Sequence, residues 1–451
     1  MSTQAEIPHL LDNPIFGSIL RYREDRFAFL TSLADRGPIL RARMGAFPLV
    51  LITSAELAHE ALVEKDADFM KGFGLSLFGK PLLGNGLLTS EGAAHRRQRK
   101  LMAPAFVQKR IAEYATEISA RTESAQVGWR DGATVDVSEA MMRLTLEIVG
   151  KTLFDAEIGS DAAEVGEALT LAMEHIVGSL SSLVPIPPTW PTPRNRRNAE
   201  AIARLDQIVY RMIREHREGG RDRGDFLSML LLAQDEDDGS VMTDKQVRDE
   251  AMTIVLAGHE TTANALAWTF YLLAQHPAVR ARLEAEVDAA LGGRTPALAD
   301  LPKLPYALQV MKEAMRLYPP VYVFARRALR NTTIGGYTVA KGRMVLFNVA
   351  GVHRAARYYP EPNRFDPDRF AVAAEKALPR QAYMPFGAGS RVCIGNHFAL
   401  LEGQLALATI AQRVRLDLAP GTVVRPSALL TLRPDGGMPM TVRRRTLVGI
   451  A

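Results

Sequence analysis

Hydrophobic and polar positions follow two different periods along the chain. Residues 38–53 read as a hairpin, because two strand-like segments, ILRARM and FPLVLI, flank a turn at Gly45. From Glu91 to about Lys312 the spacing is mostly helical, and after Tyr318 short strand-like runs appear. A last helix begins near Ile394. The pattern predicts a mainly α (α+β) protein, helical over about 54–318 and 394–415 and β-rich over about 38–53 and 320–350.

One helical segment is much longer than the others. It starts after Thr243, has Gln246 in capping-box spacing and runs to about Gln275. At 1.5 Å per residue, about 32 residues span roughly 48 Å. A helix of this length crosses the body of a globular protein, so we expect most of it to be buried.

Two segments do not fit either period. The stretch 69–89 holds five glycines and a proline among apolar residues, which argues against a helix and favours a lid or pocket wall. The proline-rich stretch Val184 to Arg194 joins two helices, either over a pocket or as a rigid surface connector.

Composition and charge narrow the class of protein. The 451 residues are 47% hydrophobic and 23% charged, which is ordinary for a globular fold. The net charge of +5 is too small to indicate nucleic acid but allows a patch for an acidic partner. The N-terminus has no basic region before an apolar core, and no apolar run reaches about 18 residues. We therefore expect a cytoplasmic protein without a membrane span.

The chain has one cysteine, Cys393. One cysteine excludes an intramolecular disulfide and multi-cysteine metal centres, and fits a reducing compartment. Gly387, Gly389 and Gly395 surround it, and a helix follows, so backbone N–H groups, the helix dipole and Arg391 are predicted to lower the thiol pKa. The site suits a thiolate, as a nucleophile or a metal ligand, although a free cysteine is more often a small buried apolar residue.

The cysteine segment has a specific sequence signature. Phe386-x-x-Gly389-x-Arg391-x-Cys393-x-Gly395 resembles, at every fixed position, the haem-binding signature of the cytochromes P-450. The resemblance implies the P-450 fold over 1–451 as a single catalytic domain. It also implies haem b between the long helix and this loop, with Cys393 as the iron ligand and the neighbouring motif residues against the cofactor.

A second motif lies in the middle of the long helix. Ala257-Gly258-His259-Glu260-Thr261-Thr262 resembles the family's oxygen-activation motif. The small residues Ala257 and Gly258 would leave room for a ligand, and Glu260 and Thr261 would relay protons to dioxygen. Three interpretations of His259 remain open: a second proton relay, a distal ligand, or a histidine whose hydrogen bonds are satisfied within its helix. A zinc protease is excluded, since Ala263 stands where the second histidine is needed.

Two further marks of the family concern buried charges. Glu313-x-x-Arg316, with Arg369 in a Phe-x-Pro-x-Arg-Phe stretch, resembles the charge cluster that steadies the cysteine loop in the family. Without the other motifs, a glutamate and an arginine at this spacing would be interpreted as a solvated surface pair. His95 and Arg99, four residues apart, resemble donors to a haem propionate.

The remaining basic positions keep alternatives open. The family places another propionate-binding arginine at Arg326, with Arg327 as the alternative. Arg96, Arg97 and Lys100 point away from His95 and form either a docking face for an acidic redox partner or a solvated surface.

The resemblance implies an O₂-dependent monooxygenase with a hydrophobic substrate, such as a fatty acid, terpenoid, steroid, polyketide or drug-like molecule. Electrons would come from a ferredoxin and its NAD(P)H-dependent reductase, and we expect a monomer. Lys71 and Lys80 are the only cations of the 69–89 segment and could hold a carboxylate. Position suggests these substrate walls: Phe73, Leu75, Leu77, Phe78, Leu82, Thr253, Ala257, Val321, Val323, Phe324 and Leu430.

Three rivals differ in chemistry. A haem-thiolate peroxygenase would use peroxide directly, and the Glu260-Thr261 pair speaks against it. A haem-thiolate sensor would need no proton relay. A cysteine hydrolase would need His397 or His353 within hydrogen-bonding reach of Cys393.

Overall fold

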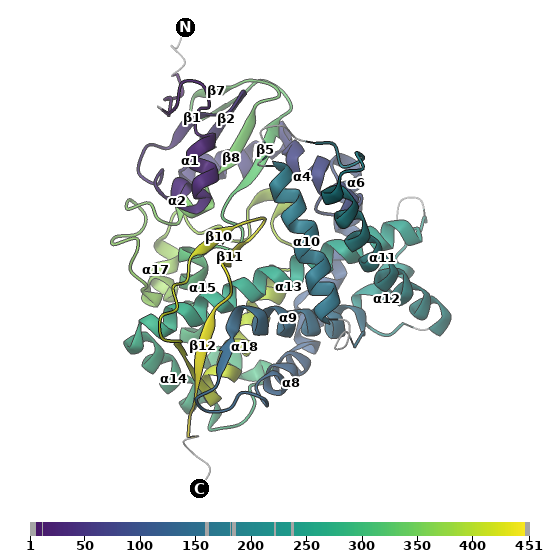
Figure 1. The fold of residues 1–451 in the computed structure, drawn as a ribbon, viewed down its shortest axis with the longest axis vertical. Coiled ribbons are helices and arrows are strands. Elements are labelled where there is room, and N and C mark those ends of the chain that lie inside the picture. Colours follow the sequence, from purple (N-terminus) through teal and green to yellow (C-terminus); the bar gives the residue numbers. More distant parts are fainter. Residues whose placement is uncertain are drawn as a thin grey trace.

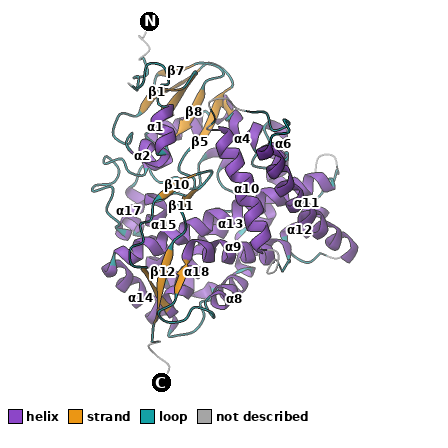
Figure 2. Ribbon diagram, in the orientation of Figure 1, coloured by secondary structure: helices purple, strands orange, loops and turns teal. Residues whose placement is uncertain are grey.

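Helices make up most of the molecule, and the strands form small sheets beside them (Figures 1 and 2). The computed structural model describes residues 6–446 except 11, 158–161, 181, 183–185, 221 and 236–238. The prediction of a mainly α protein is confirmed. Within this part of the chain, no helix is both long and apolar enough to cross a membrane. The helices are α1 (Ile19–Glu24), α2 (Arg26–Thr31), α3 (Ala55–His59), α4 (Phe73–Phe78), α5 (Lys80–Leu83), α6 (Gly92–Met102), α7 (Gln108–Glu113), α8 (Ala115–Ala125), α9 (Val137–Phe154), α10 (Ala162–Leu180), α11 (Pro193–Gly219), α12 (Phe226–Leu232), α13 (Asp244–Gln275), α14 (Pro277–Leu291), α15 (Pro305–Leu317), α16 (Val349–Val352), α17 (Val372–Ala377) and α18 (Asn396–Arg413).

The largest sheet has five strands in the order β1-β2-β8-β5-β3. The predicted hairpin is its β1–β2 pair, and Gly45 turns there with φ +61°. Strands β2 and β8 run parallel, while β5 pairs antiparallel with both β8 and β3. The strands are β1 (Ile39–Met44), β2 (Phe47–Ile52), β3 (Phe69–Lys71), β4 (Thr134–Asp136), β5 (Phe324–Ala328), β6 (Thr332–Ile334), β7 (Tyr337–Val339), β8 (Met344–Phe347), β9 (Val414–Leu418), β10 (Pro426–Ala428), β11 (Leu432–Pro434) and β12 (Pro439–Arg444).

Helix α13 is the long helix expected from the sequence, and it runs through the middle of the molecule (Figure 1). The predicted capping box is confirmed: Thr243 accepts a hydrogen bond from the Gln246 amide, and the Thr243 amide donates to Gln246 Oε1 at 2.8 Å. Most of its 32 residues are buried, against α9, α11, α15 and α18 among other elements. The helix is therefore the scaffold from which the central side chains project.

The segment 69–89 contradicts the expectation that it holds no helix. It forms β3, α4 and α5, with Gly79 between the two short helices. Packing overrides the weak propensity of a glycine-rich sequence here, because α4 lies against α10 and α5 against α13. Gly72 lies so close to β5 that a Cβ would be 2.8 Å from that of Ala325.

The end of this segment is fastened to the start of α13. Arg248 Nη1 donates to Leu82 O at 2.7 Å, and the Leu87 amide donates to Glu250 Oε2 at 2.8 Å. A Cβ at Gly86 would overlap the α13 backbone, so glycine permits this close approach. The Asn85 amide also donates to Asp249 Oδ2 at 2.9 Å, so three consecutive side chains of α13 hold the 82–87 segment in place.

The proline-rich connector between α10 and α11 lies at the surface where it is described. Ile186 and Trp190 are 44% and 59% exposed. This supports the interpretation as a surface connector for residues 186–194; Val184 and Pro185 lie outside the described residues.

Candidate active site

Cys393 lies in a glycine-shaped loop that ends at the start of α18. Its amide donates to Phe386 O at 2.9 Å, which closes the loop. Gly387 and Gly389 both have φ +71°, a conformation that favours glycine. A Cβ at Gly389 would overlap Leu62 O, so the loop needs glycine there to lie against residues 60–64.

The predicted lowering of the Cys393 pKa is wrong for the protein alone. Burial raises the thiol pKa, and this effect exceeds the opposing influence of the Gly395 amide and of Arg99. Arg391, which the sequence suggested as the nearby charge, pairs instead with Glu91. The sequence identified the amide donor but could not weigh it against desolvation.

The Glu313 cluster forms as predicted. Arg316 donates twice to Glu313, at 2.6 and 2.8 Å, and Arg369 Nε lies 3.5 Å from the same carboxylate. Arg316 also donates to His353 O at 2.8 Å, and the His353 ring accepts from the Met384 amide at 2.9 Å. The cluster is therefore linked through His353 to the segment that leads into the cysteine loop.

Basic side chains gather around His95, which is buried on α6. Burial, followed by the charges of Arg391, Lys71, Arg99 and Arg326, lowers the pKa of His95 to about 3. His95 and Arg99 thus lie in one cluster, and their role as propionate donors stays a prediction. Arg99 also acts on the Cys393 thiol, so the cluster adjoins the cysteine.

The structure favours Arg326 over Arg327 for this cluster. Arg326 is buried, and burial together with Arg391 lowers its pKa to about 10. Arg327 turns the other way on β5 and donates to the Met70 sulfur at 3.0 Å.

Several observations test whether haem fits here. The cationic side chains of this cluster repel one another. Burial, followed by the charges of Arg391 and Arg326, lowers the pKa of Lys71 to about 7. A dianionic group would relieve that repulsion. Cys393 keeps exposed surface although the protein around it desolvates its thiol, and Ala257 is exposed in the middle of a mostly buried helix. These features fit a cofactor with two carboxylates between α13 and the cysteine loop.

In the α13 motif, Gly258 faces another helix, contrary to the expectation that it leaves room for a ligand. Ala257 is exposed, but a Cβ on Gly258 would lie 3.1 Å from Val149 of α9. Gly258 therefore permits close helix packing rather than making room for a ligand. His259 is satisfied within the helix, with its Nδ1 2.9 Å from Val255 O. Thr261 Oγ1 donates to Ala257 O at 2.7 Å.

Glu260 contacts residues that sequence reasoning missed. Thr431 Oγ1 donates to its Oε1 at 2.6 Å, and Arg433 Nη2 lies 3.5 Å from the same oxygen. Burial raises the Glu260 pKa, while Arg433 and Thr431 lower it. These partners come from a hairpin about 170 residues away, and the sequence around them indicates only strands and a turn.

The expected substrate walls are only partly accessible. Phe78 and Leu82 are buried in the main hydrophobic core, as is Thr253, whose hydroxyl donates to Asp249 O. The side chain of Phe73 lies outside the described part of the structure. Leu77 is exposed, and the half-buried wall candidates are Leu75, Val321, Val323, Phe324 and Leu430.

The two lysines of the 69–89 segment differ in burial, and so do the basic residues of α6 that could dock a partner. Lys71 donates to Leu87 O at 3.0 Å and to Leu88 O, whereas Lys80 is exposed. Arg97, expected at a surface, is half-buried and donates to Asp235 and to Ser240 Oγ. Arg96 and Lys100 are exposed on α6.

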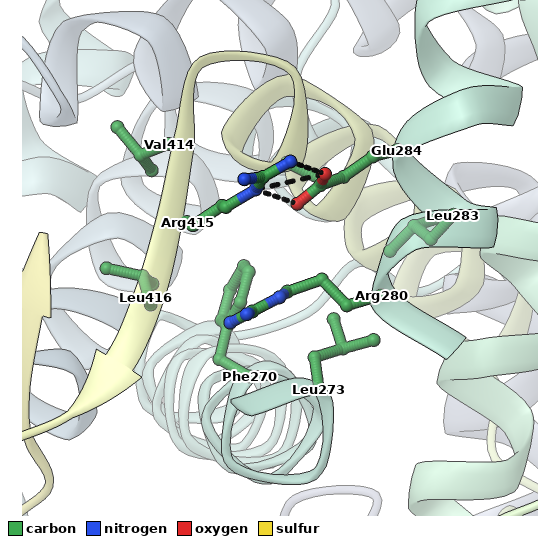
Figure 3. A pocket seen from close by; sticks show the side chains of 9 residues that line it. Phe270, Leu273, Arg280, Leu283, Glu284, Val414, Arg415 and Leu416 are labelled. Carbon is green, nitrogen blue, oxygen red and sulfur yellow. Dashed lines mark hydrogen bonds and ion pairs between the residues drawn. The ribbon is translucent and has the colours of Figure 1, made fainter. Parts of the chain in front are cut away.

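A small pocket elsewhere is separate from these residues. It lies between α13, α14 and β9, where Arg415 makes three hydrogen bonds to Glu284 (Figure 3). None of the predicted site residues lines it. Within the described chain, no group of three or more His, Cys, Asp and Glu side chains could hold a metal, and no hydrogen bond joins a histidine to Cys393.

Comparisons with known proteins agree on the family. The model of the family Cytochrome P450 matches residues 8–438. Cyclooctatin synthase of Streptomyces melanosporofaciens is 39% identical, covering 93% of this chain and 92% of that protein. Cyclooctat-9-en-7-ol 5-monooxygenase of the same organism is 40% identical, covering 91% and 89%. Pentalenene oxygenase of Streptomyces avermitilis is 32% identical over 96% of both. The crystal structure of the cytochrome P450DA heme domain aligns with TM-score 0.88 and 28% identity over 98% of both chains.

Proposed function

The chain belongs to the cytochrome P450 family and is a monooxygenase, and from this premise we propose that it holds haem b through Cys393 and oxygenates a terpenoid. The observation that carries the proposal is the basic cluster beside the cysteine. The charge of Arg99 acts on the pKa of both His95 and Cys393. Haem b carries two propionates that cationic side chains can bind, and a cysteine thiolate is one of the ligands that haem iron takes.

Each predicted cofactor residue has a part in this arrangement. Cys393 would ligate the iron, and the Gly395 amide would donate to its sulfur. His95, Arg99, Arg326 and Arg391 would hold the two propionates, since the charges of the three arginines act on His95. Ala257 would border the cofactor from α13, with Phe386 on the cysteine-loop side.

When bound, a thiolate-ligated haem supplies the chemistry that splits dioxygen and inserts one oxygen atom into a C–H bond. The chain's own task is to deliver two protons. The Thr261 hydroxyl would donate at the site, and the Glu260 carboxyl would replenish it. The raised pKa of Glu260 supports this role, because burial favours the protonated carboxyl, which is the form that can give up a proton.

The substrate class rests on two supports. The half-buried candidates for the substrate walls are apolar. The relatives at 39% and 40% identity are named for cyclooctatin and for cyclooctat-9-en-7-ol, and from these names we infer a terpenoid. We assign the electron supply to a ferredoxin and its NAD(P)H-dependent reductase, with the exposed Arg96 and Lys100 on α6 as part of the docking face.

The first experiment is the spectrum of the purified protein, reduced with dithionite and treated with CO. A red-shifted Soret band that is lost in Cys393→Ser supports the thiolate ligand. An unshifted band in the wild type would overturn it. Spin-state shifts with a panel of terpenoids, fatty acids and steroids then test the substrate class, which fails if fatty acids or steroids bind and terpenoids do not.

The second experiment tests the relay. Thr261→Ala should keep NAD(P)H consumption while product falls and peroxide rises. Thr269→Ala is the matched control, because Thr269 makes the same hydrogen bond to the carbonyl four residues earlier. Equal coupling in both variants would refute the assignment of Thr261.

A further inference from the structure

The hairpin formed by β10 and β11 is attached to one face of α13 (Figure 1). Trp268 Nε1 donates to Leu432 O at 2.9 Å, and Asn264 Nδ2 donates to Thr431 Oγ1 at 3.1 Å. Glu260, Asn264 and Trp268 are four residues apart, so they project from the same side of the helix. The hairpin is also fixed from behind, where the Leu432 amide donates to Pro320 O at 2.9 Å.

The Thr431 hydroxyl donates its hydrogen to Glu260 while it accepts one from Asn264. A hydroxyl has a single hydrogen to give, and it already accepts from Asn264. Its hydrogen is directed at Glu260 Oε1, 2.6 Å away. Because Oε1 accepts from Thr431 and a carbonyl oxygen is the better acceptor of a carboxylic acid, this hydrogen bond favours a proton on Oε2.

Arg433 supplies the charge that faces this carboxyl. Its Nη2 lies 3.5 Å from Glu260 Oε1, and within the described residues neither Nε nor Nη2 makes a hydrogen bond. The Arg433 side chain is 16% exposed and that of Glu260 is 1% exposed. The guanidinium is thus mostly buried, and its Nη2 lies near a buried acid.

Burial favours the uncharged form of two further titratable groups, one beside Glu260 on α13 and one on α18. Burial lowers the pKa of His259, its neighbour on α13, to about 4. Burial raises the pKa of Glu402, on α18 beside Thr262, well above the ordinary range. Arg433 is the charge that the structure sets against Glu260.

We propose that Thr431 and Arg433 are positioning residues for the proton-relay acid: the hydroxyl fixes the orientation of the Glu260 carboxyl, and the guanidinium controls when that carboxyl carries a proton. The inference rests on the proposed function, in which Glu260 replenishes Thr261. It assigns to the C-terminal hairpin a part in proton delivery, beyond its packing on the fold.

The test is infrared titration of the carboxyl band of the purified holoenzyme, assigned by its loss in Glu260→Gln. An opposite charge within about 4–6 Å typically changes a carboxyl pKa by about 1–3 units, so Arg433→Leu should move the Glu260 titration that far toward higher pH. Arg433→Lys should restore most of it. Arg425→Leu, an exposed arginine beside the same hairpin, should leave it unchanged.

Thr431→Val should shift the frequency of the band, and Thr431→Ser should restore it. The pH profile of product per NAD(P)H should move in parallel with the titration. If Arg433→Leu and Thr431→Val lower thermal stability but leave the Glu260 band unmoved, the residues only pack and the inference is overturned. If Glu260→Gln itself leaves coupling unchanged, the relay assignment falls instead, and the two failures are distinguishable.

Discussion

Glu250 on α13 carries the sharpest prediction about stability. Its carboxyl is fully buried, accepts from the Leu87 amide at 2.8 Å and has one oxygen without a hydrogen bond within the described structure. Burial, with a smaller contribution from Asp249, raises its pKa from 4.5 to about 7, against the Leu87 amide and Lys71, which lower it. The folded protein therefore holds this proton to a higher pH than the unfolded chain does.

The sign and size of the effect follow from linkage. Because the folded pKa is the higher one, the free energy of unfolding falls as the pH rises from about 4.5 to about 7. A difference of about 2.5 pH units corresponds to about 3.4 kcal/mol in full, and about 2.5 kcal/mol of it develops between about pH 5 and pH 8. Glu250→Gln keeps an oxygen for the Leu87 amide but cannot ionise.

The assay is thermal unfolding of the holoenzyme and Glu250→Gln at both pH values. At about 2.1 cal/mol/K per residue over 451 residues, the advantage of the variant should grow by about 2–3 °C from pH 5 to pH 8. Glu218→Gln, the same change at an exposed position, should show no such growth. If the melting temperatures of Glu250→Gln and the wild type differ by the same amount at both pH values, the reasoning is refuted.

Three further predictions concern packing. Gly389→Ala should lower thermal stability and haem retention more than Gly387→Ala, because both have φ +71° but only the first would meet Leu62 O; equal losses in the CO spectrum would contradict this. Glu313→Gln should lower the free energy of unfolding by about 3–5 kcal/mol, since it removes the charge that balances the buried Arg316; a loss below about 1 kcal/mol in denaturant titration would show that the pair is not needed. Trp268→Phe removes the donor to Leu432 O and should cost about 1–3 kcal/mol, seen as faster amide hydrogen exchange at Leu432; unchanged exchange would mean that other contacts hold the hairpin.

Local features were predictable because neighbouring residues decide them. The capping box of α13 needs only Thr243 and Gln246, and the turns of the cysteine loop follow from the positive φ of its own glycines. The Glu313–Arg316 pair follows from the spacing of three residues on a helix. In each case the interacting atoms lie within a few residues of each other along the chain.

Distant partners were not predictable. Nothing in the spacing around Arg97 indicates Asp235, and nothing around Glu260 indicates Thr431 and Arg433. Helical period told us which residues share a face with Gly258, but not that Val149 packs against that face. The segment 69–89 is helical only because α10 and α13 bury it.

The sequence by itself determined the family and the lone thiol and pointed to the residues proposed for the chemistry, since these depend on residue type and local spacing. Only the tertiary structure decided how those groups ionise and what holds them. Burial raises the pKa of the Cys393 thiol despite its amide donor, and it raises that of Glu260 despite Arg433. Desolvation depends on everything packed around a group, and that surrounding comes from segments far away along the chain.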